Sequence, residues 1–383
     1  MKKRHSNCNS QLPVLTALLN DFPTKKIPEI KSIVFVCVQH LVFTTVNLID
    51  ALIQLGATPD NIHIMGKSYS SCSEVADQLV ERGYHYYPNS HQDKIGSFAE
   101  YFVQDVKRMW RIVYEELQKK EIKLIVVLDD GGSCLSNVPD YISKTYSLVG
   151  VEQTRSGLAH LRTHKLSFPV IDVASSAAKQ LVESPMIAEA VVKKVSKVLP
   201  LNKATFSTGV AGLGVIGNVT AQKLLSLNHH VITYDKESEQ TQLFPQYLHT
   251  KNVKELIHES EYIFGCTGED ITTRLEAKDI NADKVFISCS SQDKEFLTLL
   301  KMFEAQKCQY DHVLDHLECS LNGHLVKIYR GGFPINLDNS GESVEAQDIQ
   351  LTRGLLLGGI LQGILYALLY PKQSKLYMLH PTI

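Results

Sequence analysis

The most constraining feature of this sequence is a glycine-rich turn placed between an apolar strand and a helix. Phe206–Ala211 predicts a buried strand, and the run Gly212-Leu-Gly-Val-Ile-Gly217 follows it at once. Val219–Leu227 has the apolar spacing of a helix, and His230–Tyr234 predicts the next strand. A strand–turn–helix–strand unit of this kind pairs its two strands in parallel, which requires a layered α/β fold.

The glycines and an acidic residue after the second strand meet the requirements of a dinucleotide site. Gly212 permits the tight turn, Gly214 lets the backbone approach a pyrophosphate, and Gly217 lets helix and strand pack closely. The helix N-terminus offers free N–H groups to phosphate oxygens. Asp235, 18 residues after Gly217, can accept hydrogen bonds from a ribose, and its charge disfavours a 2′-phosphate. The pattern predicts NAD rather than NADP, bound by Gly212, Gly214, Val215, Ile216, Gly217 and Asp235.

Strands and helices alternate along the rest of the chain as well. Further strands are predicted at Ile33–Val38, Ile62–Met65, Leu124–Leu128, Tyr146–Val151, Pro169–Val173 and Tyr262–Thr267. Helices are predicted at Thr44–Leu55, Cys72–Arg82, Phe98–Lys120 and Ser175–Leu199. We therefore expect an α/β protein of two domains, a doubly wound substrate domain (1–180) and a Rossmann-type NAD domain (185–345). Residues 346–383 are expected to return to the substrate domain or to an oligomer contact.

Composition excludes some classes of partner. The 383 residues are 44% hydrophobic and 21% charged, with a net charge of −2, an ordinary balance that gives no reason to expect nucleic acid. The eight cysteines show no CxxC spacing, which predicts free thiols in a reducing compartment and no metal site. No apolar segment follows the basic N-terminus, so we expect a cytoplasmic protein.

One apolar run challenges the soluble interpretation. Gly354–Tyr370 is almost wholly apolar, with small-residue spacings at Gly354/Gly358 and Gly359/Gly363. It is shorter than the roughly 20 residues that usually cross a bilayer, and it contains Gln362. We expect a buried helix or one that contacts another copy of the chain rather than a membrane span, and from it a homodimer or homotetramer.

Seven segments, in order, resemble the S-adenosylhomocysteine hydrolases. The first is Val36–Gly56 with His40, followed by VLDDGGSCL, VEQTRSGLAHL and PVIDVASSAAKQLVES ahead of the glycine turn. GVAGLGVIG, GCTGEDI and GGFPINLDNSGE complete the series. The match extends from about residue 30 to the end.

The resemblance implies a hydrolase of one-carbon metabolism that retains its NAD. In that family NAD oxidises the 3′-hydroxyl of a nucleoside ribose, the 4′ proton is removed, the 5′ thiol leaves, and water adds before the ketone is reduced again. It further implies a small, nucleoside-like thioether as the ligand. The reaction needs carboxylates and a lysine around the ribose hydroxyls and acid/base groups near the 5′ position.

Carried over by position, the resemblance assigns roles to particular residues. His40 matches the acid/base histidine near the 5′ position, Asp130 an acidic site residue, and Lys179 the lysine beside the ribose hydroxyls, with Glu183 four residues later. It implies that Thr44, Gln153 and Glu342 contact the substrate. It also implies further NAD contacts from Thr154, Arg155, Ser156, Cys266, Thr267, Gly268 and Asn336.

Several positions depart from the family pattern. Gln153 replaces a glutamate and cannot take up a proton, Glu183 replaces an aspartate, and Thr44 replaces the glutamate that reads the adenine amino group. Glu342 stands in place of a histidine, and Cys289–Phe296 lacks the family's other histidine. The family's C-terminal tail has no counterpart before Ile383, so we expect easier exchange of NAD.

Each candidate also has a structural interpretation. His40 could be a packed histidine, Asp129 and Asp130 could cap a turn, and Lys179 with Glu183 could form a surface ion pair. The leading hypothesis is an adenosylhomocysteinase-like enzyme. The alternatives are a non-catalytic relative that binds NAD for regulation or structure, and an NAD-dependent oxidoreductase of a different nucleoside or sugar.

Overall fold

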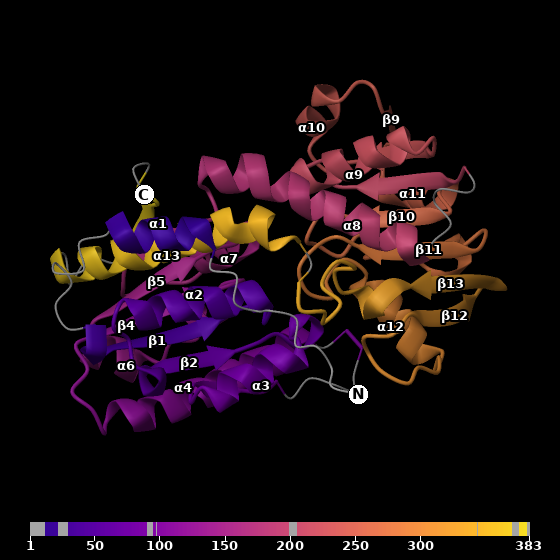
Figure 1. Cartoon of the computed structure of the whole chain (residues 1–383). Coiled ribbons are helices and arrows are strands. Elements are labelled where there is room, and N and C mark those ends of the chain that lie inside the picture. The colour runs from indigo at the N-terminus through magenta and orange to yellow at the C-terminus, as the bar shows by residue number, and fades with distance from the viewer. Residues whose placement is uncertain are drawn as a thin grey trace, which may run out of the picture. The chain divides into compact units, whose positions relative to one another are not determined.

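The structure is a computed structural model and describes residues 12–21, 30–89, 95–96, 98–198, 205–342, 344–369 and 375–380 (Figure 1). The chain forms two compact units. Unit 1 comprises Met1–Ser90, Tyr101–Glu183 and Asn339–Ile383, and unit 2 comprises His91–Glu100 and Ser184–Asp338. The chain passes between the units after Glu183 and after Asp338, whereas the expected domains meet at 180/185 and 345/346. The sequence pattern did not indicate that His91–Glu100 belongs with unit 2.

Unit 1 is built on a seven-stranded sheet in the order β14-β6-β5-β4-β1-β2-β3. All its pairings are parallel. The strands are β1 (Ile33–Val38), β2 (Ile62–Met65), β3 (His85–Tyr87), β4 (Leu124–Asp129), β5 (Leu148–Glu152), β6 (Val170–Asp172) and β14 (Leu376–Met378). Strand order runs outward in one direction from β1 to β3 and in the other from β4 to β6, so its topological switch point lies between β1 and β4.

The helices of unit 1 cover both faces of this sheet, as expected for buried parallel strands. They are α1 (Pro13–Asp21), α2 (Phe43–Gln54), α3 (Ser73–Glu81), α4 (Phe98–Leu117), α5 (Ser133–Ser136), α6 (Asp140–Thr145), α7 (Arg155–Arg162) and α13 (Ala346–Leu369). Helix α4 begins in unit 2 and continues in unit 1. A π-helix occupies Lys179–Glu183, and short 3-10 turns lie at Ile30–Ser32, Pro59–Asn61 and Ser68–Ser70.

The apolar C-terminal helix α13 packs inside unit 1, beside α1 and against β4, β5 and β6 (Figure 1). It is the one helix among the described residues with the length and hydropathy of a membrane span, and 72% of its apolar window is buried. A Cβ on Gly359 would lie 2.7 Å from Val173, and one on Gly354 would lie 2.3 Å from Val14. The small residues therefore admit neighbours from the same chain. The prediction of a buried helix is confirmed. Because this helix packs against elements of its own chain, it gives no argument for an oligomer. Tyr370, the last residue of the predicted run, lies outside the described residues.

Unit 2 repeats the order of the five strands around the switch point in a second seven-stranded sheet, β12-β13-β11-β10-β7-β8-β9, and differs from unit 1 in its last two strands at one edge. Its strands are β7 (Ser207–Ala211), β8 (His230–Tyr234), β9 (Leu248–His249), β10 (Tyr262–Gly265), β11 (Lys284–Ser288), β12 (Leu317–Leu321) and β13 (His324–Ile328). Its helices are α8 (Ser184–Val198), α9 (Val215–Ser226), α10 (Ser238–Leu243), α11 (Val253–Glu259) and α12 (Leu297–Ala305), with 3-10 turns at Ala277–Asp279 and Tyr329–Gly332. Only β12 is antiparallel to its neighbour among these strands. The predicted α/β class, with a Rossmann-type domain and a second doubly wound domain, is confirmed.

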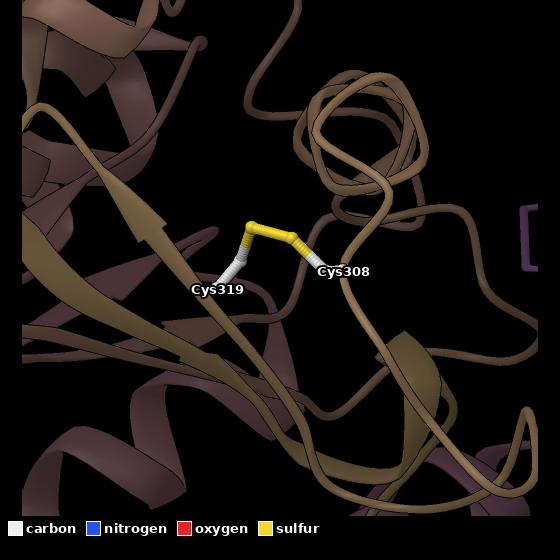
Figure 2. Close-up of a disulfide and its surroundings, with 2 residues drawn as sticks. All are labelled: Cys308 and Cys319. Atoms are coloured by element: carbon white, nitrogen blue, oxygen red, sulfur yellow. A yellow bond between two sulfur atoms is a disulfide. The ribbon is translucent and has the colours of Figure 1, made fainter.

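The expectation of free thiols is wrong for one pair of cysteines. Cys308, just after α12, and Cys319, in β12, form a disulfide with their Cα atoms 5.6 Å apart (Figure 2). The pairing arises because the chain turns back after α12 into an antiparallel strand, and an 11-residue separation carries no recognisable motif. The cysteines described as free are Cys37, Cys72, Cys134, Cys266 and Cys289, while Cys8 lies outside the described residues.

Candidate functional site

The switch point of unit 1 brings two predicted site residues together. His40 follows the end of β1, and Asp130 follows the end of β4, its neighbour in the sheet. Parallel strands end at the same edge, and ligands bind open α/β sheets at the edge where strand order reverses. The His40 Nε2 lies 3.4 Å from the Asp130 Oδ2. The structure therefore brings these two residues into contact, and their roles in a ligand site stay a prediction.

Asp130 is a buried carboxylate with three polar neighbours. Lys67 Nζ forms an ion pair with Oδ1, and Gln153 Nε2 donates a hydrogen bond to Oδ2, where His40 also approaches. The side chains of Asp130 and Lys67 are only 3% and 1% exposed. Burial opposes the charged form, but Lys67 and His40 hold the pKa of Asp130 well below its usual range. Asp130 therefore stays ionised and accepts hydrogen bonds rather than storing a proton.

Lys67 is a site residue that sequence reasoning missed. It lies just after the end of β2, at the same edge of the sheet as His40 and Asp130. Burial favours the neutral amine, but the charge of Asp130 outweighs it and raises the pKa of Lys67 above its ordinary value. The one available signal was its position directly after a predicted strand, which a lone lysine does not make specific.

His40 is held in place and kept neutral. Thr45 Oγ1 donates to the His40 carbonyl at 2.7 Å, and Ser70 Oγ lies 2.5 Å from the ring Nδ1. Burial lowers the pKa of His40 to about 4; Asp130 opposes this shift, and the nearby cations Lys67, Arg353 and Lys179 add to it. At neutral pH the imidazole is uncharged, the form that can accept a proton.

Lys179 and Glu183 form an ion pair of 3.1 Å, with their side chains 13% and 12% exposed. The predicted regular helix at this point is wrong in detail, because Lys179–Glu183 is a π-helix, a geometry often found at functional sites. Thr352 Oγ1 in α13 donates to Glu183 Oε2 at 2.5 Å. The low exposure and this third partner argue against the alternative of a solvated surface pair.

Thr44 joins two charged residues of the C-terminal segment. Its backbone N–H donates to Glu342 Oε1 at 2.5 Å, and Arg353 Nε donates to its hydroxyl at 3.1 Å. Thr44 and Glu342, both predicted to contact substrate, are therefore hydrogen-bonded to each other. Gln153, the third residue of that prediction, is instead hydrogen-bonded to Asp130. Arg353, 6% exposed, was missed because it sits at the start of an apolar run that reads as core.

A buried carboxyl pair supports the loops that carry Asp130 and Gln153. Asp129 and Glu152 are register partners on β4 and β5. Glu152 Oε1 accepts the N–H of Gly131 at 3.1 Å and that of Thr154 at 2.7 Å, while Asp129 Oδ2 accepts from Leu135 N at 2.8 Å. Burial raises the pKa of Asp129 to about 7 and that of Glu152 well above its ordinary value. Asp129 is therefore a structural residue of the loop, as the capping alternative implied.

The predicted cofactor residues of unit 1 have less specific surroundings. Thr154 caps α7, since its hydroxyl accepts from Gly157 N at 2.9 Å, and it donates to Glu152 Oε1 at 2.7 Å. Arg155 and Ser156 begin α7 and are exposed. Their contact with NAD stays a prediction.

The glycine turn of unit 2 has the shape that a dinucleotide requires. Gly212 has φ +93°, and a Cβ there would lie 2.9 Å from the Cys266 backbone. A Cβ on Gly217 would lie 1.8 Å from the Gly212 carbonyl oxygen, so that glycine permits the close helix–strand contact. A Cβ on Gly214 would meet nothing within 4 Å. The space over Gly214 is open, and α9, beginning with Val215 and Ile216, has no side-chain cap on its first N–H groups.

Other predicted cofactor residues line the same edge of the unit 2 sheet. Asp235, half-buried after β8, accepts the Leu213 N–H at 2.6 Å, which places its carboxylate against the glycine turn. Cys266, Thr267 and Gly268 follow β10. Asn336 is 5% exposed. The open space over Gly214 leaves room for a phosphate group beside the helix N-terminus. The contact of these residues with NAD stays a prediction.

Glu295 is a further unit 2 residue that the sequence did not indicate. It is fully buried and accepts hydrogen bonds from Gly268 N, Ser290 Oγ and Thr267 Oγ1, the last at 3.0 Å. Burial raises its pKa to about 7. Glu295 therefore holds the β10 exit loop in place. Throughout the part of the chain that the structure describes, no group of three or more His, Cys, Asp or Glu side chains is arranged to hold a metal ion.

Comparisons with known proteins find distant relatives. No family model matches the chain. Two uncharacterized proteins of Mycobacterium tuberculosis, from strains CDC 1551 and H37Rv, are each 27% identical over 339 residues. The match covers 87% of this chain and 64% of each relative, so the chain spans less than two thirds of their length.

Several solved structures match a similar share of this chain, at lower sequence identity. A dipicolinate synthase from Bacillus subtilis is 12% identical, covering 86% of this chain and 97% of that chain with a TM-score of 0.42. Phosphoglycerate oxidoreductase from Vibrio cholerae is 12% identical, with coverage of 86% and 98% and a TM-score of 0.42. The dipicolinate synthase of Bacillus halodurans is 10% identical, with coverage of 85% and 98% and a TM-score of 0.47. The fold class itself rests on the two strand orders.

Proposed function

We propose that this protein is an NAD-dependent enzyme that transiently oxidises a hydroxyl of a nucleoside-like or sugar-like ligand, in the manner of the adenosylhomocysteinases. One observation carries the proposal. His40, Asp130, Lys179 and Glu183, assigned from the resemblance, gather in unit 1 with low exposure and mutual electrostatic effects. Separately, the switch edge of unit 2 has a turn that fits a dinucleotide.

Each residue of unit 1 has a definite chemical capacity. The ionised Asp130 accepts hydrogen bonds from ligand hydroxyls, and the Lys179–Glu183 pair offers a donor and an acceptor to a neighbouring hydroxyl. Neutral His40 takes up a proton from the ligand. Bound NAD would supply the reversible two-electron oxidation, held by Gly212, Gly214, Gly217, Asp235 and Asn336. Lys67 keeps Asp130 charged throughout.

A second candidate is a non-catalytic relative that binds NAD for regulation or structure. The observation in its favour is Gln153. Its amide donates a hydrogen bond to Asp130, and unlike a glutamate it cannot take up a proton from a ligand. The two candidates differ in one test. Purified protein loaded with NAD is titrated with adenosine, inosine, uridine and ribose while the absorbance band of NADH is followed. The enzyme forms NADH with at least one of them; a binder with an inert site forms none.

We further propose that S-adenosylhomocysteine is a poor substrate. Thr44 stands where the family reads the adenine amino group, and here its N–H and hydroxyl already bind Glu342 and Arg353. Losing a charged acceptor of that kind costs ~1.5–3 kcal/mol of binding. The test is homocysteine release at saturating NAD. Turnover on the order of 1–10 s⁻¹ would contradict this proposal and support the full family activity.

A cytoplasmic location, a role in one-carbon metabolism and a homodimeric or homotetrameric assembly belong to the same proposal. The burial of α13 within unit 1 supplies no surface for the assembly, so another face must provide it. Light scattering of the full chain tests the assembly directly. A monodisperse monomer would remove it from the proposal.

A further inference from the structure

The most unusual charge in unit 1 is the guanidinium of Arg353. The residue is 6% exposed and its Nε donates to Thr44 Oγ1 at 3.1 Å. Among the residues that the structure describes, its two terminal nitrogens have no hydrogen-bond acceptor, and no carboxylate lies within ion-pair distance of them. Burial lowers the pKa of Arg353, although a guanidinium stays charged at any physiological pH. Its terminal nitrogens are not among the enclosed side-chain atoms that lack a partner, so their four N–H groups have accessible surface and are open to a ligand.

The acids around Arg353 are already engaged elsewhere. Glu183 binds Lys179 at 3.1 Å and accepts from Thr352 at 2.5 Å. Asp130 is paired with Lys67. Glu342 accepts the N–H of Thr44 at 2.5 Å, and Thr44 stands between it and the guanidinium. Each neighbouring carboxylate therefore has its own hydrogen-bond donor, and none of them binds the two terminal nitrogens of Arg353.

Arg353 is also next to the candidate catalytic groups. Thr352, its neighbour in α13, binds Glu183, and Thr45, the neighbour of its partner Thr44, binds the His40 carbonyl. The charge of Arg353 contributes to lowering the pKa of His40. Arg353 thus lies within electrostatic range of His40, Glu183 and Asp130.

We infer that Arg353 binds an anionic group of the ligand, a carboxylate or a phosphate, through a bidentate pair of hydrogen bonds. Both groups present paired oxygens that match the planar fork of arginine. The inference rests on the proposed function, because it takes the unit 1 cluster as the ligand site. It makes the ligand an acidic sugar or acidic nucleoside rather than a neutral nucleoside.

The test compares matched pairs of ligands on the NAD-saturated full chain by calorimetry. Ribose 5-phosphate against ribose tests a phosphate, and glucuronate against glucose tests a carboxylate. We expect at least one acid to bind ~10-fold or more tightly than its neutral partner, the scale of a charge-assisted hydrogen bond. The acid that shows the preference identifies the group. If neither acid is preferred, the inference is wrong.

Variants locate the effect. Arg353→Met removes the preference, and Arg353→Lys, which keeps the charge but loses the fork, retains part of it. Arg82→Met is the control, since Arg82 pairs with Asp50 at the surface of unit 1 and should leave the preference unchanged. A preference that survives in Arg353→Met overturns the inference. Should Arg353→Met not fold, Arg353→Lys decides, because an undiminished preference there contradicts a forked contact.

The outcome is separable from that of the proposed function. If the acid preference depends on Arg353 but no ligand produces NADH, the anion site stands and the redox proposal fails. If NADH forms with neutral ligands and no acid preference exists, the redox proposal stands and the anion site fails.

Discussion

The buried Lys67–Asp130 ion pair gives the strongest prediction on stability. Lys67→Met removes the cation and leaves a carboxylate that is 3% exposed. Taking one partner from a buried pair typically costs ~3–5 kcal/mol, because the remaining buried carboxylate has lost its cation and keeps only polar neighbours such as Gln153. With an m-value of about 2 kcal/mol/M, the urea midpoint of unit 1 falls by roughly 2 M. Removing both charges in Lys67→Met/Asp130→Asn recovers most of this loss.

The chain has a convenient reporter for this experiment. Its single tryptophan, Trp110, is fully buried in unit 1, where its ring N–H donates to the Cys134 carbonyl at 3.2 Å. Fluorescence therefore follows unfolding of unit 1 during urea titration. The control is Lys144→Met, whose partner Asp140 is 85% exposed, and which should not shift the midpoint measurably.

The pH dependence provides a second check on the same pair. Because the folded pKa of Asp130 lies below its unfolded value, its stabilising effect is present above the unfolded pKa, near 3.9, and is lost as pH falls. In Lys67→Met that benefit is gone, so the gap between variant and wild type narrows towards acid pH. A Lys67→Met midpoint equal to wild type near neutral pH would refute the claim that this pair is buried and ionised.

Four further predictions concern the cofactor, the redox step and the buried acids. Asp235→Ala should weaken NAD binding and relax the preference over NADP, and equal affinity of the unmodified protein for both cofactors in calorimetry would count against this role. Gly214→Ala should leave thermal stability unchanged, because a Cβ there meets nothing within 4 Å. It should weaken the binding of NAD on the order of 10-fold, because the added methyl group blocks the approach of the pyrophosphate, and an unaltered NAD affinity would contradict this. Lys179→Ala should abolish NADH formation with any cognate ligand while the surface variant Lys144→Ala retains it, as followed by absorbance. The pKa of Asp129 is raised to about 7, so its own contribution to the stability of unit 1 falls from about pH 4 to about pH 7, whereas the lowered pKa of His40 adds a contribution that rises over much of this range. Asp129→Asn should therefore make the change of the urea midpoint with pH, read by tryptophan fluorescence, more positive between about pH 4 and about pH 7; an unchanged slope would show that Asp129 does not titrate there.

The sequence predicted the strands and the glycine turn well because their signals are local. Ile33–Val38 is apolar at every position and is buried at every position, so its bounds match the observed strand. Gly212 and Gly217 each have a steric reason that a sequence pattern expresses directly, and Gly214 leaves open space above the turn. His40 and Asp130 were assigned from the family resemblance, together with their positions just after buried strands.

The residues that were missed depend on tertiary contacts. Lys67 and Arg353 lie in segments whose patterns indicate an ordinary loop and an ordinary core helix, and only burial beside other charges distinguishes them. The Cys308–Cys319 disulfide has no motif at its spacing. The apolar run Gly354–Tyr370 does not support an oligomer, because a sequence cannot say whether such a helix packs within its own chain, as this one does.

The proposed chemistry requires that the ligand is oxidised and then reduced again, so that NAD is restored. The most direct measurement is the time course of NADH absorbance in a single turnover of the NAD-loaded protein, with ribose 5-phosphate and the nucleosides as ligands. We predict that NADH rises and then returns to baseline while the ligand is converted to a product that keeps its hydroxyl. NADH that accumulates in step with an oxidised product would make this a net oxidoreductase, and a flat trace with every ligand would make it a binding protein; either result would contradict a transient oxidation.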